Sequence, residues 1–273
     1  METGQRSSSS SPGYSKAILW TSVGYERNVR ALIPSGKSPL QALEAVLPQA
    51  KLAGWSKVKG TVDKALLSYE ARECSHLTYK IGVLYAHAGG LSEDELYSAR
   101  GGSAHYDEFL AFLGEKVALQ GWRKYRGGLD VASNTTGTHS VYTTLGPIEI
   151  MFHVCTLLPW VENDKQKLER KRHLGNDFVT IVFFDPHSEG AASASAAPAG
   201  FDPSILTSQF TQVVVVVSPV LDSEGKCTKY SINVVAKPGI SPFPPYINAS
   251  GIYPKDDATR TFLLTKSKFI KYS

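Results

Sequence analysis

The sequence predicts an α/β domain with a central mixed β-sheet flanked by helices. Segments with apolar residues at helical spacing alternate with short segments that are rich in β-branched and aromatic residues. The segment from Phe178 to Phe184 is apolar almost throughout, as is typical of a strand that is covered on both faces. This alternation favours a sheet layer packed against helices.

The N-terminal part of the chain differs in composition from the rest. Residues 1–13 are rich in serine and are expected to form a disordered leader. We expect residues 14–76 to form a helical segment, because apolar residues recur at helical spacing between Ser38 and about Ala71. The main domain is then expected at residues 77–273, and the segment from Leu77 to Ala86 opens its sheet.

Two helices and a hairpin are expected next. Ser92 precedes three acidic residues and is a candidate helix cap, and the segment from Tyr106 to Leu113 is amphipathic. Tight connections at residues 126–130 and 134–137 predict a hairpin that continues into residues 139–143.

The second half of the chain continues the alternation. A charged helix is expected from residue 163 or 164 to His173, and Gly175 stands where helices commonly end. Residues 187–200 are low in complexity and are expected to be a flexible insertion. The other segments expected here are strands at Ile148 to Leu157, Thr211 to Val220 and Tyr230 to Ala236, and a short helix at Leu263 to Phe269.

Composition excludes several classes of protein. No apolar run reaches the roughly 18 residues that a membrane span requires, so we expect a cytoplasmic protein, which could be recruited to endomembrane surfaces as part of a larger protein. The three cysteines, at 74, 155 and 227, lack the spacing of a disulfide framework or a zinc site. A net charge of +4 is too small to indicate nucleic-acid binding. Lysine and arginine are concentrated at residues 165–172, as on a solvated helix whose cations face the negative end of its dipole.

The common catalytic motifs are missing. Neither glycine-rich nucleotide motif occurs, so we do not expect the protein to bind a nucleotide by itself. The serine elbow and the His-Glu-x-x-His motif are also absent. His139, His153 and His173 lack neighbouring carboxylates in the sequence, which favours structural histidines and predicts no metal site.

The junction at Gly175-Asn176-Asp177 is the remaining candidate site. Taken alone it is an ordinary loop sequence, for which a turn or capping role is the simplest interpretation. It lies, however, between a charged helix and an apolar strand, and such a rigid base is what a side chain needs if it acts on another protein.

Five segments resemble the Rap-type GTPase-activating domain family. They occur in the family's order and are residues 79–85, 125–130, 136–142, 151–154 and 171–177. Within the family, residues 173–179 and 252–255 are most similar to the branch that contains tuberin, whereas residues 136–142 are closer to the branch that acts on Rap. The fold that the resemblance implies is that of the family's catalytic domain.

The resemblance implies a function and a site. The chain would stimulate GTP hydrolysis by a Ras-family small GTPase, with Rheb as the first candidate partner and Rap as the second. Asn176 would be the "asparagine thumb" that positions the attacking water, and His173 would brace it. GTP and Mg²⁺ would be held by the partner, so the chain would have no cofactor of its own. The expected GTPase contacts are Lys171, Arg172, Gly175, Asp177 and Lys80.

Alternatives to this function remain open. An arginine finger could replace the thumb, and the candidates are Arg123, Arg126 and Arg170. The chain could also bind a GTPase as a scaffold without accelerating hydrolysis. The resemblance suggests a homodimer through the residues before Leu77, although helices there could simply cap the sheet.

Overall fold

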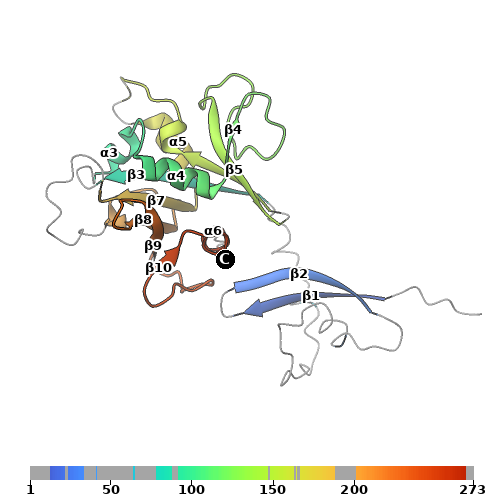
Figure 1. The fold of residues 1–273 in the computed structure, drawn as a ribbon. Coiled ribbons are helices and arrows are strands. Elements are labelled where there is room, and N and C mark those ends of the chain that lie inside the picture. The colour runs from blue at the N-terminus through green and yellow to red at the C-terminus, as the bar shows by residue number, and fades with distance from the viewer. Residues whose placement is uncertain are drawn as a thin grey trace, which may run out of the picture. The chain divides into compact units, whose positions relative to one another are not determined.

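The structure is a computed structural model that describes residues 13–21, 24–33, 41, 64, 78–87, 92–146, 148–162, 164, 167–187 and 201–268. The chain divides into two compact units (Figure 1). One unit comprises Met1–Leu67 with Phe243–Tyr246, and the other comprises Ser68–Pro242 with Ile247–Ser273.

The first unit contains an antiparallel pair of strands, β1 (Gly13–Thr21) and β2 (Gly24–Ile33). This corrects the expectation of a helical segment that begins at residue 14. The helical spacing on which the expectation rests begins only at Ser38, so it gave no evidence about residues 14–33. A strand forms its hydrogen bonds with a partner segment, and the spacing of residues within one segment does not reveal that partner. The expected helices between residues 38 and 71 lie almost entirely outside the described residues. The expected leader at residues 1–13 also lies outside them, except for Gly13, which begins β1.

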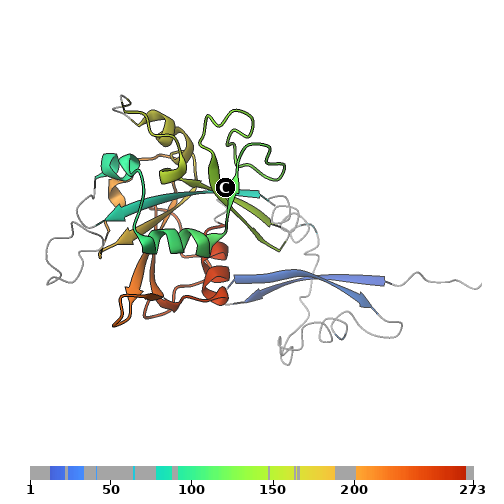
Figure 2. The same ribbon diagram turned by 45° about the horizontal axis from the view of Figure 1, so that its top comes forward.

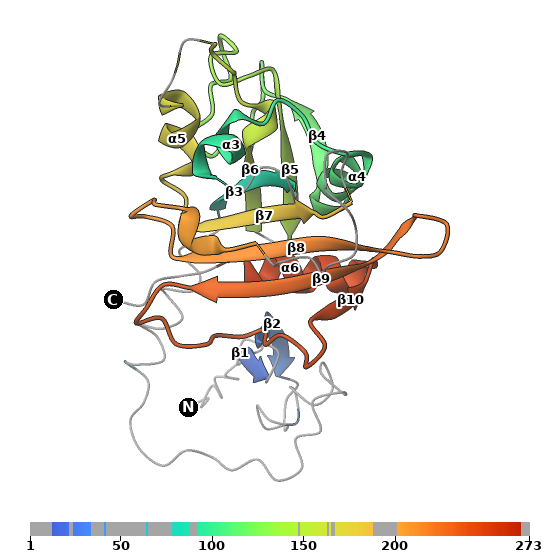
Figure 3. The same cartoon turned by 90° about the vertical axis from the view of Figure 1, so that its left-hand side faces the viewer.

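The second unit contains an eight-stranded sheet with the order β10-β9-β8-β7-β3-β6-β5-β4 (Figure 3). Its strands are β3 (Thr78–His87), β4 (Glu115–Ala118), β5 (His139–Leu145), β6 (Ile148–Val154), β7 (Val179–Asp185), β8 (Val213–Leu221), β9 (Cys227–Ala236) and β10 (Ile252–Pro254).

The sheet is mixed, as predicted. The neighbours β6, β3, β7 and β8 are parallel, and the outer strands on both sides are antiparallel. In the register of the central strands, Gly82 of β3 lies between His153 of β6 and Thr180 of β7. The parallel strands are buried on both faces, which is why their sequences are apolar almost throughout.

Helices cover both faces of the sheet. The helices are α3 (Glu93–Ser98), α4 (Ala104–Leu113), α5 (Leu168–Leu174) and α6 (Asp257–Lys266). Helices α4 and α6 lie next to each other (Figure 2). Phe109 of α4 stacks on Phe183 of β7 with ring centroids 4.9 Å apart, and Arg260 of α6 donates to the carbonyl of Phe112. Leu96 of α3 and Leu174 of α5 instead belong to a core cluster that includes Val182 and Phe184 of β7. These two strand residues alternate with Phe183, so α3 and α5 lie on the opposite face of the sheet from α4.

Several boundaries differ from the prediction. Residues 119–138 form a long loop, and the antiparallel partners of β5 are β4 and β6, so the hairpin expected around residues 126–143 is wrong. Helix α5 begins only at Leu168 because Lys167 has the left-handed conformation (φ 52°), which no right-handed helix contains. The insertion expected at residues 187–200 lies outside the described residues, except for His187.

Two further findings concern expected absences. No helix among the described residues is long and apolar enough to cross a membrane. Cys155 and Cys227 are free and buried, whereas Cys74 lies outside the described residues.

Candidate functional site

The turn after α5 is shaped by Gly175. The backbone N–H of Gly175 donates to the carbonyl of Lys171 at 2.7 Å, and that of Asp177 donates to the carbonyl of Leu174 at 3.1 Å. Gly175 has an ordinary helical conformation (φ −64°), so it is not required for a left-handed turn. A Cβ at this position would lie 2.4 Å from the carbonyl oxygen of Lys171. Glycine is therefore required by this close approach, which brings the chain directly from the helix to Asn176.

Asn176 is exposed, and the two ends of its carboxamide have different surroundings. Nδ2 donates to the carbonyl of Arg172 at 2.7 Å and so caps the last turn of α5. Oδ1 accepts no hydrogen bond from any described residue. The amide is therefore held by its nitrogen, while its acceptor oxygen remains available to a molecule outside the protein.

A buried polar cluster lies under the turn. Asp177 has 0% of its surface exposed, and its Oδ2 lies 2.8 Å from Nδ1 of His153. The other ring nitrogen, Nε2, lies 2.9 Å from the carbonyl oxygen of Gly127. Both ring nitrogens of His153 therefore lie within hydrogen-bond distance of an oxygen. Nζ of Lys80 lies 3.5 Å from Oδ1 of Asp177, so an ammonium group and an imidazole ring flank one buried carboxylate.

The cluster corrects the expected role of Asp177. A fully buried carboxylate cannot contact a partner's surface directly. Asp177 therefore acts within the protein, where its buried side chain anchors the backbone directly after Asn176. Lys80, whose side chain is 36% exposed, reaches from the cluster to the surface. A GTPase contact by Lys80 stays a prediction.

His173 lies beside this cluster. Its ring meets the ring of His153 edge-on, with centroids 5.7 Å apart. Burial, followed by the neighbouring His153 and Arg172, lowers the pKa of His173, so the neutral ring is favoured. His139, in contrast, is exposed and contacts Thr138, so only two of the three histidines come together. Among the described residues, no group of histidine, cysteine and acidic side chains is placed to hold a metal ion.

The loop before β8 holds the turn from the other side. The hydroxyl of Ser208 donates to the carbonyl of Gly175 at 2.7 Å, and the hydroxyl of Thr211 donates to the carbonyl of Asp177 at 3.1 Å. The backbone N–H of Gln212 donates to the carbonyl of Phe178 at 2.8 Å. Three successive parts of the turn are therefore bonded to one loop.

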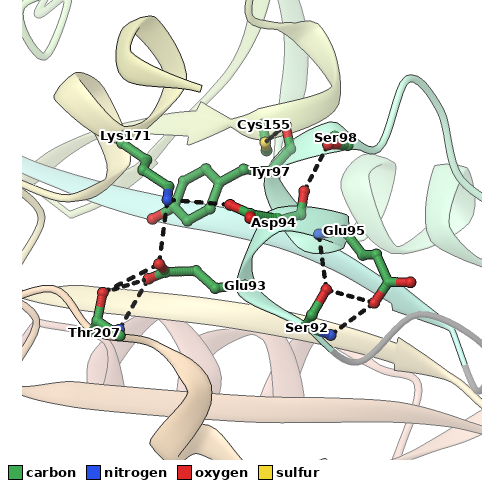
Figure 4. A network of polar contacts seen from close by, with 9 residues as sticks. All are labelled: Ser92, Glu93, Asp94, Glu95, Tyr97, Ser98, Cys155, Lys171 and Thr207. Carbon is green, nitrogen blue, oxygen red and sulfur yellow. Dashed lines mark hydrogen bonds and ion pairs between the residues drawn. The ribbon is translucent and has the colours of Figure 1, made fainter. Parts of the chain in front are cut away.

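Helix α3 joins α5 to the same loop through Glu93 (Figure 4). Its carboxylate accepts from Nζ of Lys171 at 3.3 Å and from the backbone N–H of Thr207 at 2.9 Å. Asp94 lies 3.4 Å from the same ammonium group. Lys171 thus has partners within the protein, and a contact between Lys171 and a GTPase stays a prediction.

The arginines differ in their availability. Arg172 is exposed and its side chain has no partner among the described residues. Arg170 is buried, and its guanidinium donates to the carbonyls of Pro159, Tyr97, Ala99 and Leu158. This set of bonds removes Arg170 from the candidates for an arginine finger. Arg123 and Arg126 are exposed, and Arg126 adjoins Gly127, whose carbonyl contacts His153.

The site therefore brings together residues from segments that are far apart in the sequence. Five of the predicted residues lie near the N-terminal ends of β3 and β7. They are Lys80, His173, Gly175, Asn176 and Asp177. Sequence reasoning missed four supporting residues, because no local pattern marks a carboxylate or hydroxyl that bonds to a distant turn. These residues are Glu93, Thr207, Ser208 and Thr211. His153 was expected to be a structural histidine, and it contacts Asp177 and the carbonyl of Gly127.

Comparisons with known proteins identify a matching family and similar sequences. The model of a family described as Rap/ran-GAP matches residues 96–273. A GTPase-activating protein of Dictyostelium discoideum is 37% identical over 256 residues, which are 92% of this chain and 23% of that protein. The human GTPase-activating Rap/Ran-GAP domain-like protein 3 is 36% identical over 256 residues, 92% of this chain and 24% of that protein. The chain thus spans about a quarter of the length of these relatives.

A solved structure has the same fold. The structure of the TSC2 GAP domain superposes with a TM-score of 0.57 and 28% sequence identity, and the match covers 70% of this chain and 95% of that chain.

Proposed function

Because the chain belongs to the Rap/Ran-GAP family, we propose that it stimulates GTP hydrolysis by a Ras-family small GTPase and that Asn176 is the residue it supplies. The observation that carries the proposal is the state of the Asn176 amide, whose nitrogen is bonded to Arg172 and whose oxygen is exposed and available.

The proposed mechanism follows from the chemistry of the amide. Hydrolysis requires a water held in line with the γ-phosphate, and the partner GTPase holds the nucleotide and its Mg²⁺. Oδ1 of Asn176 accepts a hydrogen bond from this water and so fixes its direction of attack. A carboxamide does not take up a proton at neutral pH, so Asn176 orients the water and is not a general base.

The surroundings of Asn176 support this role. The bond to Arg172 fixes the plane of the amide. The bonds from Ser208 to Gly175 and from Thr211 to Asp177 fix the backbone on both sides of Asn176, and the side chain of Asp177 is buried in the core. Such support keeps the amide in one position before the complex forms, which lowers the entropy cost of positioning the water.

The proposed partner is Rheb first and Rap second. The order rests on the resemblance of residues 173–179 and 252–255 to the tuberin branch. Support for Rap comes from the words Rap/ran-GAP that describe the family and several relatives.

An arginine finger is the second candidate mechanism. It is favoured by Arg126, which is exposed and adjoins the carbonyl that bonds to His153. In this mechanism a guanidinium would stabilise charge on the phosphate, in place of an amide that orients water.

Phosphate release from GTP-loaded Rheb and Rap tests the proposed activity. The chain is added at about one hundredth of the GTPase concentration, so that stimulation requires many turnovers. We expect multiple-turnover stimulation with one of the two GTPases. Release at the intrinsic rate with both, despite measurable binding, would identify a scaffold and contradict the proposal.

A further inference from the structure

A small cavity lies at the carboxyl end of the parallel strands, whereas the turn that carries Asn176 lies at their other end. The cavity has a volume of about 340 Å³. It is lined by Tyr85 and His87 of β3, by Glu95 and Ser98 of α3, and by residues 99–101. Ligands of α/β proteins commonly bind at this end of a sheet, and a cavity of this size fits a small molecule.

Residues 99–102 form one wall of the cavity and are held at both ends. They connect α3 on one face of the sheet to α4 on the other, so they cross the edge of the sheet. The guanidinium of Arg170 donates to the carbonyl of Ala99 at 2.7 Å. At the other end, a Cβ on Gly102 would clash with the ring of Tyr106, so glycine allows the wall to lie directly against α4. The wall therefore has a fixed backbone before any ligand arrives.

Arg100 presents a guanidinium whose face is occupied and whose edge is available. Its Cζ lies 3.4 Å from the ring centroid of Trp160 and so rests over that ring. No described residue accepts a hydrogen bond from the Arg100 side chain. A stacked guanidinium keeps its N–H donors in the plane of the group, where they fit the two oxygens of a carboxylate or phosphate. The cavity thus contains a held positive charge without an acidic partner among the described residues.

Glu95 presents the opposite charge to the same cavity. Its Oε2 accepts from the backbone N–H and the hydroxyl of Ser92, at 2.9 and 2.6 Å, in the capping box of α3 (Figure 4). These bonds are the main cause that lowers the pKa of Glu95, and His87 lowers it further, so the carboxylate is charged at neutral pH. Oε1 accepts from no described residue. The capping role therefore uses one oxygen and leaves the other available.

The two charges of the cavity do not neutralise each other, because no ion pair joins Glu95 to Arg100. Opposite charges that line one cavity without contact are complementary to a molecule that carries both charges. A ligand with only a negative charge would be repelled by Glu95, and one with only a positive charge by Arg100. The rings of Tyr85 and His87, whose centroids are 6.3 Å apart, offer a surface for the carbon atoms between the two charged groups.

We propose that this cavity binds a small zwitterion, in which a carboxylate or phosphate group pairs with Arg100 and an ammonium group pairs with Glu95. Amino acids and the phosphate esters of amino alcohols have this chemistry. The inference goes beyond the proposed function and does not depend on it, because binding of the zwitterion requires neither a GTPase nor Asn176.

Ligand-observed NMR titration tests the inference, because it detects the weak binding that is expected of small molecules. The probes are glycine, γ-aminobutanoate and ε-aminohexanoate, in which the two charges are increasingly far apart, and phosphoethanolamine, in which the acidic group is a phosphate. Butanoate, hexanoate, butylamine and hexylamine are the matched probes with a single charge. We expect at least one zwitterion to bind about tenfold more tightly than every single-charge probe. The tightest probe identifies the acidic group and its distance from the ammonium group.

Arg100→Gln and Glu95→Gln test the two contacts separately. Each variant should weaken binding of the tightest zwitterion about tenfold, because it removes one charged partner. Glutamine at position 95 keeps the capping box, since its amide oxygen can accept from Ser92. Arg123→Gln and Glu115→Gln are the matched controls, because both residues are exposed and neither lines the cavity. They should bind the probe as the parent does.

The Arg100→Lys variant separates loss of charge from loss of packing. Lysine keeps the positive charge and can lie over Trp160, so it should weaken binding less than Arg100→Gln does. Absence of saturable binding by all four zwitterions would overturn the inference. Equal affinity for a zwitterion and for its single-charge counterparts would do the same, as would equal effects of the cavity variants and their controls.

Discussion

At the scale of single residues, the turn after α5 separates support from presentation. Asp177 and Asn176 are neighbours in the sequence, yet the carboxylate of Asp177 is fully buried between Lys80 and His153, whereas the carboxamide of Asn176 is exposed. A capping bond from Asn176 and an exposed acceptor oxygen are compatible, because a carboxamide has a donor end and an acceptor end. The capping role therefore belongs to the nitrogen of the Asn176 amide, and the proposed role toward a partner belongs to its oxygen.

His173 gives the site a dependence on pH. Burial, His153 and Arg172 lower the pKa of His173 from its ordinary value of 6.5. Below pH 6.5 the unfolded chain takes up a proton that the folded chain resists, so the contribution of His173 to stability is present above that pH and is lost as the pH falls through the lower folded value.

The His173→Gln variant tests this dependence by urea unfolding at several pH values. We expect the difference in unfolding free energy between the parent and the variant to be constant above neutral pH and to move in favour of the variant as the solution is acidified below 6.5. Parallel curves for the two proteins across this range would show that His173 titrates normally in the folded state.

At the scale of elements, Glu93 connects three segments. Its carboxylate joins helix α3 to Lys171 of α5 and to Thr207 of the loop whose next residue, Ser208, bonds to Gly175 (Figure 4). The turn that carries Asn176 is thus enclosed between a helix and a loop that share one anchor. Glu93 contacts no reacting atom in this arrangement, and its role is to position other groups.

We predict that Glu93→Gln lowers the maximal stimulated rate about three- to tenfold with little change in half-saturating concentration, because a looser anchor allows the amide to leave its productive position. The Lys171→Met variant should have a similar effect, and the double variant should lose less than the product of the two, since both remove one contact.

Glu108→Gln is the control for Glu93. Glu108 of α4 also pairs with a lysine, but that lysine, Lys255, directly follows the edge strand β10 and does not belong to α5. An effect of Glu108→Gln as large as that of Glu93→Gln, or fully independent effects of Glu93→Gln and Lys171→Met, would show that Glu93 does not position the turn.

At the scale of the whole molecule, the central sheet was the part most readily predicted. Strands β3, β7 and β8 are apolar runs bounded by polar residues, and a strand buried on both faces needs no pairing information to be recognised. The pairing of β4 with β5, and the hairpin of β1 and β2, depend on contacts between segments and were not predicted.

The site was predictable in the same uneven way. Asn176, Gly175 and His173 follow from the junction of a helix and a strand together with the family resemblance. Glu93 and Ser208 could not be predicted, because each acts through a bond to a residue far along the chain. The burial of Asp177 and of Arg170 was likewise hidden, since both types of residue are normally exposed.

The fold also narrows the choice of mechanism. Of the three arginines proposed as fingers, Arg170 donates all its described hydrogen bonds to backbone carbonyls, which leaves Arg123 and Arg126 as candidates. Both belong to the loop of residues 119–138, which adjoins the site through Gly127. Asn176 and these two arginines thus belong to different segments of the chain, so their substitutions can be tested independently.

The maximal single-turnover rate of GTP hydrolysis with Asn176→Ala and with Arg126→Ala, at saturating concentrations of the chain, tests the central claim most directly. We expect Asn176→Ala to lower the stimulated rate at least about a hundredfold while it still binds the GTP-loaded partner. Asn176→Asp should fail as well, because it places a negative charge near the phosphate. Arg126→Ala should keep the rate within about threefold of the parent. A normal rate for Asn176→Ala together with a lost rate for Arg126→Ala would contradict the account.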